Sequence, residues 1–199
     1  MKGTLIILLF FIAGLIFGIV DFFPAYLSGD RMTTYVLYAL LFFVGIGVGT
    51  NKETLYILKT ANWRIILIPL SVIVGTFLGT TIYTLFDPSL TLRECWAVGA
   101  GYGYYSLSSI IIKEMAGETL GVIALLSNII REIITLVFTP VLKRYFGFLA
   151  PISAGGATTM DTTLPVITKY IGIEYVAFSV FSGLVLTLLV PFIIPFILS

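Results

Sequence analysis

The sequence contains no histidine and only one cysteine, Cys95. Without histidine, the chain lacks the most common general base, proton shuttle and transition-metal ligand in proteins, so a zinc site is not expected. Cys95 cannot form an intrachain disulfide and has no histidine to activate it as a nucleophile, so we expect it to be structural. We therefore expect no metal, no cofactor and no enzymatic activity.

Charge is also scarce. Charged residues make up 11% of the chain, 11 Lys and Arg against 10 Asp and Glu, whereas hydrophobic residues make up 59%. No basic or acidic tract is present, so the charge pattern gives no indication of nucleic-acid binding. This balance lies far from that of a soluble domain. It predicts a multi-pass membrane protein in which residues 1–199 form one domain.

Five segments are long and apolar enough to cross the bilayer as helices. They lie at residues 4–22, 34–50, 63–86, 119–142 and 174–198. The first one also resembles a signal peptide, because Lys2 precedes an apolar run. No A-x-A-like cleavage site follows before Asp21, so we interpret this segment as a membrane span.

Two further apolar segments, residues 95–113 and 147–168, are interrupted in the middle by small and polar residues. Backbone stays unwound at membrane depth only where protein or a wet cavity satisfies its polar groups. If both segments cross the bilayer, six cations lie on the cytoplasmic side against four outside; if both are re-entrant hairpins, the count is seven against three. Because the cytoplasmic side normally carries the excess, we expect hairpins.

The two hairpins would enter from opposite faces, as an inverted pair. The expected fold is therefore all-α, with five full transmembrane helices and two broken re-entrant hairpins. Broken elements at corresponding positions of two halves indicate the binding site of a transporter, with polar tips near the midplane. The alternative is that both interruptions are glycine-rich packing kinks.

Ionisable residues inside apolar segments are costly and are functional candidates. Arg131, Glu132 and Asp161 are such residues, and Asn128 lies on the same helical face as Glu132. The alternative for Arg131 and Glu132 is a polar pair that only holds helices together. The alternative for Asp161 is an N-cap of a short helix that Pro165 helps to start.

The formal charges of these three ionisable residues leave one negative charge unmatched. A carboxylate at Asp161 could bind a proton or a cationic substrate, and competition between the two would produce antiport. The expected site also includes hydroxyl and glycine residues of both interruptions: Tyr104, Tyr105, Ser106, Ser108, Gly155, Gly156, Thr158, Thr159, Thr162 and Thr163.

Three stretches resemble the motifs of the LysO lysine exporters: Gly101-Tyr-Gly-Tyr-Tyr-Ser-Leu-Ser108, Ser127-Asn-Ile-Ile-Arg-Glu132 and Gly155-Gly-Ala-Thr-Thr-Met-Asp-Thr-Thr-Leu-Pro-Val166. The resemblance covers residue 34 to the C-terminus. It implies a proton-linked L-lysine efflux carrier in the cytoplasmic membrane of a prokaryote, in which Asp161 matches the acid that the family ties to transport. The choice of lysine among small cations comes from the resemblance alone.

The sequence departs from fuller members of that family, which carry about three more N-terminal helices and a second functional acid. This departure implies a homodimer, a separately encoded small membrane partner, or the use of Glu132 in place of the second acid. An ion or small-solute channel built on two opposed re-entrant loops is the alternative function. An intramembrane enzyme with Ser106 or Ser108 as nucleophile is disfavoured, because no histidine could activate either residue.

Overall fold

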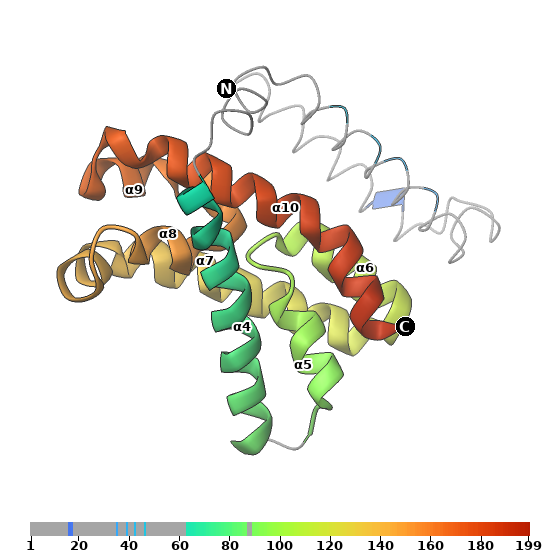
Figure 1. Ribbon diagram of the computed structural model, residues 1–199. Helices are drawn as coiled ribbons and strands as arrows, with labels where there is room; N and C mark the ends of the chain where they lie inside the picture. The colour runs from blue at the N-terminus through green and yellow to red at the C-terminus, as the bar shows by residue number, and fades with distance from the viewer. Residues whose placement is uncertain are drawn as a thin grey trace. The chain divides into compact units, whose positions relative to one another are not determined.

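The computed structural model describes residues 63–86 and 89–199, with Ile16, Phe17, Tyr35, Ala39, Phe42 and Ile46 (Figure 1). The predicted spans at 4–22 and 34–50 lie outside those two ranges. Every element described below belongs to one unit, Phe43–Ser199. These ranges contain helices and no β-strand, as the sequence predicts.

The elements follow one another along the chain with short connections. In order they are η1 Trp63–Ile66, α4 Leu67–Phe86, α5 Leu92–Gly99, α6 Tyr105–Ala116, α7 Glu118–Phe146, α8 Ala150–Gly155, η2 Gly156–Met160, α9 Leu164–Ile171, η3 Ile173–Tyr175 and α10 Val176–Leu198. Within residues 63–86 and 89–199, three helices are long and apolar enough to cross a membrane: Leu67–Phe86, Glu118–Phe146 and Ile173–Leu198. They correspond to the predicted spans at 63–86, 119–142 and 174–198.

The boundaries of these helices follow from local chemistry. Thr91 and Glu94 form a capping box at the start of α5: the Glu94 amide donates to Thr91 Oγ1 at 3.3 Å, and the Thr91 amide donates to Glu94 Oε2 at 2.7 Å. Gly117 and Gly147 flank α7 with φ of 93° and 89°. Only glycine adopts such angles without strain, so α7 is separated cleanly from α6 and α8.

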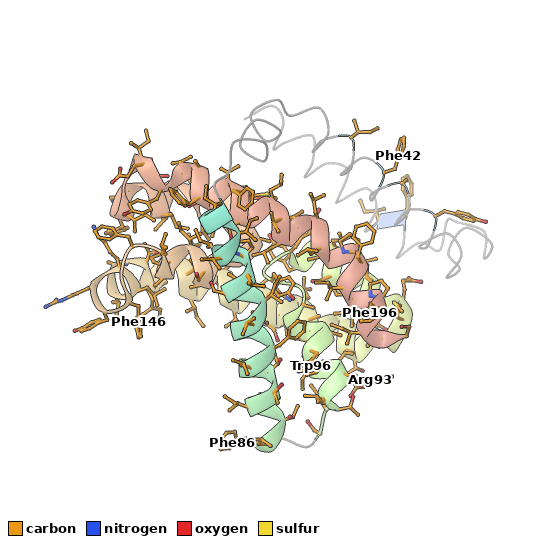
Figure 2. All side chains as sticks on the ribbon, in the orientation of Figure 1. Phe42, Phe86, Arg93, Trp96, Phe146 and Phe196 are labelled. Atoms are coloured by element: carbon orange, nitrogen blue, oxygen red, sulfur yellow. The ribbon has the colours of Figure 1, made fainter. Side chains whose placement is uncertain are left out.

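Helix α7 buries several polar side chains and exposes many large apolar ones. The buried positions include Ala124, Asn128, Thr135 and Thr139. The exposed positions carry large apolar side chains: Val122, Leu126, Ile130, Ile133, Ile134, Val137, Phe138 and Val141. A surface of this kind is unfavourable in water and suits lipid. Figure 2 shows the same exposure at the ends of α4 and α7, where Phe86 and Phe146 point outward.

Both interruptions predicted from the sequence are present. The first break, residues 100–104, separates α5 from α6; the second break, residues 156–163, contains η2 and separates α8 from α9. Helix α5 packs against α4, α7 and α10, whereas α6 packs mainly against α7. The arms of each broken segment thus make few contacts with each other, and the hairpin topology stays a prediction.

A buried apolar cluster holds the second broken segment in place. Ile68 of α4, Ile152 of α8, and Ile167 and Ile171 of α9 pack together, with Tyr175 and Phe178 beside them. Helix α10 packs on η2 and α9 and covers the second break. The break is therefore held from both sides, which fixes the polar residues that it carries.

Candidate functional site

The two breaks contact each other directly. The Ala157 amide of the second break donates a hydrogen bond to the Tyr102 carbonyl of the first, at 2.8 Å. Gly156 has φ of 62°, and a Cβ atom there would overlap the Tyr102 carbonyl oxygen. A Cβ on Gly103, whose φ is 97°, would lie 3.1 Å from the Gly155 carbonyl oxygen. The glycines of both motifs are thus required for the close approach of two unwound backbones.

Asn128 on α7 holds the first break. Its Oδ1 accepts a hydrogen bond from the Gly103 amide at 2.7 Å. Its Nδ2 donates to the carbonyls of Ala124, at 2.8 Å, and Val98, at 3.3 Å. Asn128 is buried, and these bonds use both of its amide hydrogens and its acceptor. The residue therefore positions the first break rather than presenting free donors to a ligand.

Arg131, one helical turn further along α7, holds the second broken segment. Its Nε donates to the Ala154 carbonyl at 2.8 Å, and Nη2 donates to the Ser153 carbonyl at 3.2 Å. These carbonyls lie at the C-terminal end of α8, where a cation is favourable. Among the described residues, no carboxylate forms an ion pair with the guanidinium. The pairing of Arg131 with Glu132 considered from the sequence is therefore wrong.

Two threonines of the second break bond to nearby backbone carbonyls, including one on α10. Thr158 Oγ1 donates to the Gly155 carbonyl at 2.9 Å and lies 3.3 Å from Thr163 Oγ1. Thr159 Oγ1 lies 2.7 Å from the Gly156 carbonyl oxygen and 2.9 Å from that of Ser179 on α10. Thr158, Thr159 and Thr163 are buried. Their first role is to satisfy unwound backbone in an apolar environment.

Asp161 ends η2 with an exposed side chain. Its Oδ1 accepts a hydrogen bond from the Thr162 amide at 2.6 Å, and no described cation forms an ion pair with it. The N-cap of α9 is Thr163, without a side-chain cap bond. The N-cap interpretation of Asp161 is therefore wrong, because η2 continues to Met160 and places α9 three residues after the acid.

Asp161 lines a small cavity of about 80 Å³ together with residues from both breaks. Its walls include five predicted residues: Tyr104, Tyr105, Ser106, Thr158 and Thr162. Met160 and Thr187 complete it from η2 and α10, with Thr187 Oγ1 lying 3.9 Å from Met160 Sδ. The structure thus brings the acid together with hydroxyl groups of both motifs.

A larger cavity of about 420 Å³ lies between α4, α5 and α7. It is lined by Thr76, Thr80, Val98, Gly99, Asn128 and Arg131, among others. Sequence reasoning missed Thr76 and Thr80, although their spacing of four residues in an apolar span places both hydroxyls on one helical face. The Nη1 atom of Arg131 lies 3.4 Å from Thr76 Oγ1, so the guanidinium forms part of this cavity wall.

The remaining predicted residues lie elsewhere. Ser108 is fully buried, and its Oγ has no hydrogen-bond partner in the described ranges. Glu132 is partly buried and lines neither of the two cavities. Gly155 is tightly enclosed by the side chains of Thr159, Thr135 and Thr163, so it serves packing.

A family model and two individual proteins that resemble this chain all indicate the same family. The family model "Lysine exporter LysO" matches residues 8–198. The Lysine exporter LysO of Escherichia coli K12 is 35% identical over 162 residues, 81% of this chain and 53% of that protein. A putative lysine exporter of Haemophilus influenzae is 34% identical over 169 residues, 83% of each chain. The chain thus spans about half the length of the E. coli relative.

No solved structure matches the chain. The family assignment therefore depends on sequence alone. With the family model covering nearly the whole chain, the conclusion is direct: the chain belongs to the LysO family of lysine exporters.

Proposed function

We propose that this protein is a secondary transporter of the prokaryotic cytoplasmic membrane that exports L-lysine, or a similar small cationic amino acid, in exchange for protons. The names of its relatives support lysine as the substrate. The apolar spans and the contact between two unwound segments support a carrier, because transporters place their sites where broken helices meet.

The observation that carries the proposal is the position of Asp161. Its carboxylate lies among hydroxyl groups where the breaks meet, and no described Lys or Arg pairs with it. A carboxylate in such a place can be neutralised by a proton or by a cation, but not by both at once. Alternation between these two occupants couples outward movement of the cation to inward movement of a proton.

The exchange also has an electrical advantage. An inside-negative potential opposes exit of a monovalent cation by about 2.3 kcal/mol per 100 mV. Exchange of one proton for one such cation moves no net charge, so this cost disappears. Because Asp161 is a single site for both ions, it supports a one-for-one exchange.

Transport in proteoliposomes tests this proposal. Vesicles loaded with unlabelled lysine should take up labelled lysine by saturable counterflow, and an imposed pH gradient should drive net lysine movement. Asp161→Asn should reduce proton-driven exchange roughly 10–100-fold, since contacts with a charged group contribute about 1.5–3 kcal/mol. Glu174→Gln is the matched control, because Glu174 is an exposed acid outside the cavities. Full exchange in Asp161→Asn, or non-saturable flux typical of a channel, would contradict the proposal.

The topology of the broken segments is a second part of the proposal. The charge count supports re-entrant hairpins that form an inverted pair. Single cysteines at positions 113 and 143, in a Cys95→Ser background, test this with a membrane-impermeant thiol reagent. Hairpins place position 113 outside and position 143 inside; labelling from the opposite sides would establish that both segments cross the membrane.

The subunit composition completes the proposal. The family resemblance implies a second acid, supplied by a homodimer or by a small membrane partner. Crosslinking in native membranes followed by mass determination should give a species larger than the 21.8 kDa chain. A chain that transports lysine as a purified monomer would contradict this part alone.

A further inference from the structure

The two cavities differ too much in size to hold the same ligand. The cavity beside Asp161 has about 80 Å³, room for only a few water molecules, whose share of liquid volume is about 30 Å³ each. The cavity between α4, α5 and α7 has about 420 Å³, within the range of roughly 300–1,000 Å³ of small-molecule sites. A whole amino acid fits the larger cavity and does not fit the smaller one.

The larger cavity has a cation in its wall. Arg131 forms no ion pair with any acid in the part of the chain that the structure describes. Its Nε and Nη2 atoms are engaged by the carbonyls of Ala154 and Ser153. A guanidinium has five N–H donors, and in the described ranges Nη1 makes one hydrogen bond, to Thr76 Oγ1 at 3.4 Å, which uses one of its two N–H groups. Since Thr76 also lines the cavity, the second N–H group of Nη1 is available to a ligand there.

The other wall groups cannot replace this cation. Asn128 has both amide hydrogens bonded to backbone carbonyls. Thr80 donates to the backbone of its own helix, with its Oγ1 2.9 Å from the Thr76 carbonyl oxygen. The single charged group that faces the described cavity is thus positive, so the complementary part of a ligand is an anion. An amino acid carries one such group, its α-carboxylate.

We propose that the cavity between α4, α5 and α7 holds the body of the substrate, and that Arg131 binds its α-carboxylate. This inference depends on the proposed function, because it assigns parts of a transported amino acid to two places. The large cavity recognises the carboxylate, and the small one at Asp161 holds in turn a proton or the ammonium end of the substrate. The substrate class is then α-amino acids with a free carboxylate, and diamines of the same length are excluded.

Competition with lysine analogues tests the role of Arg131. L-lysine amide lacks the carboxylate charge, and 1,5-diaminopentane lacks the whole group. Both should inhibit lysine counterflow by the wild type at least about tenfold less well than lysine itself. Arg131→Gln should lower lysine affinity to that of the amide, so the ratio between the two ligands approaches one. An unchanged ratio, with all ligands weakened equally, would show that Arg131 only holds α8, and would overturn the proposal.

A second pair of variants tests the cavity without touching Arg131. Gly79 lines the cavity and Gly75, one turn earlier on α4, does not; a Cβ atom at either position meets nothing within 4 Å. Gly79→Leu should fill space beside Thr76 and raise the KM for lysine roughly tenfold, whereas Gly75→Leu should change it less than about twofold. An unchanged KM in Gly79→Leu would overturn the proposal. Absence of lysine counterflow by the wild type would instead refute the proposed function itself.

Discussion

The two breaks of this chain are stabilised in different ways. The first break is held by the neutral amide of Asn128, which bonds to Gly103 and to the Val98 carbonyl. The second is held by the charged Arg131 at one end and by its own threonines in the middle. The first break is therefore held by a neutral side chain, whereas the second is held in part by the charged Arg131 of α7 and contains the charged Asp161.

The side chains that hold the two breaks can be distinguished from the groups that are free to bind a ligand. Helix α7 places Asn128 and Arg131 one turn apart, so a single rigid element positions both breaks. The groups with spare capacity are the Nη1 atom of Arg131 and the carboxylate of Asp161, and they line different cavities. The motif at residues 127–132 thus positions the backbone of both breaks. The motifs at 101–108 and 155–166 supply the glycines where the breaks meet, and the latter also contains Asp161.

The largest expected effect is at the contact between the breaks. Gly156→Ala places a Cβ against the Tyr102 carbonyl at φ of 62°, so we expect a loss of about 3 kcal/mol or more and a strongly lowered melting temperature in detergent. Gly147→Ala is the control, because φ there is 89° and the space is open; it should cost only about 1–2 kcal/mol. Equal destabilisation by both variants would mean that the close approach of the breaks is unimportant.

Loss of either supporting side chain should loosen one break selectively. Arg131→Met leaves two carbonyls without a charged donor, at about 1.5–3 kcal/mol in total, whereas Asn128→Leu leaves the Gly103 amide without its acceptor, at about 1–3 kcal/mol. Amide hydrogen exchange should rise at residues 153–160 in the first variant and at 100–104 in the second. Increases spread evenly over both breaks would contradict separate supports.

A smaller effect is expected where the second break meets α10. Thr159→Val removes the hydrogen bond to the Ser179 carbonyl, which should cost about 0.5–1.5 kcal/mol, while Thr159→Ser keeps the hydroxyl and should stay close to the wild type. Melting temperatures of the two variants in the same detergent measure this. A serine variant as unstable as the valine variant would assign the role of Thr159 to its methyl group instead.

The smallest effect is expected away from both breaks. Lys113 and Glu118 form a salt bridge at 3.1 Å with both side chains largely exposed, and such pairs contribute only about 0–1 kcal/mol. Lys113→Gln should leave lysine counterflow unchanged and alter the melting temperature by little. A loss of transport in this variant would show that the site extends to the α6–α7 corner.

The positions of the breaks could be predicted from the sequence, because clusters of Gly, Ser and Thr inside apolar segments conflict with a continuous helix. The importance of Asn128 and Arg131 was also predictable, since polar groups in such segments need partners. The hydrogen-bond partners of these two side chains could not be predicted from the sequence. Arg131 bonds to carbonyls 22 and 23 residues away, and this depends on how the segments cross.

Thr76 and Thr80 were missed for a different reason. A threonine in a helix can bond to the backbone of the preceding turn, as Thr80 does, so its presence in an apolar span needs no ligand to explain it. The cap of α9 was misplaced because a short 3₁₀ element is hard to distinguish by sequence from a loop. In both cases the local sequence is compatible with two structures, and the tertiary packing determines which of them forms.

The central claim is that Asp161 exchanges a proton for the cationic substrate, and proton release on lysine binding measures this directly. Isothermal titration of the purified protein with L-lysine, in buffers of different ionisation enthalpy, counts the protons released. We expect about one proton to be released per bound lysine in the wild type and none in Asp161→Asn. Equal proton release by both proteins, or lysine binding by the wild type without proton release at any pH, would contradict it.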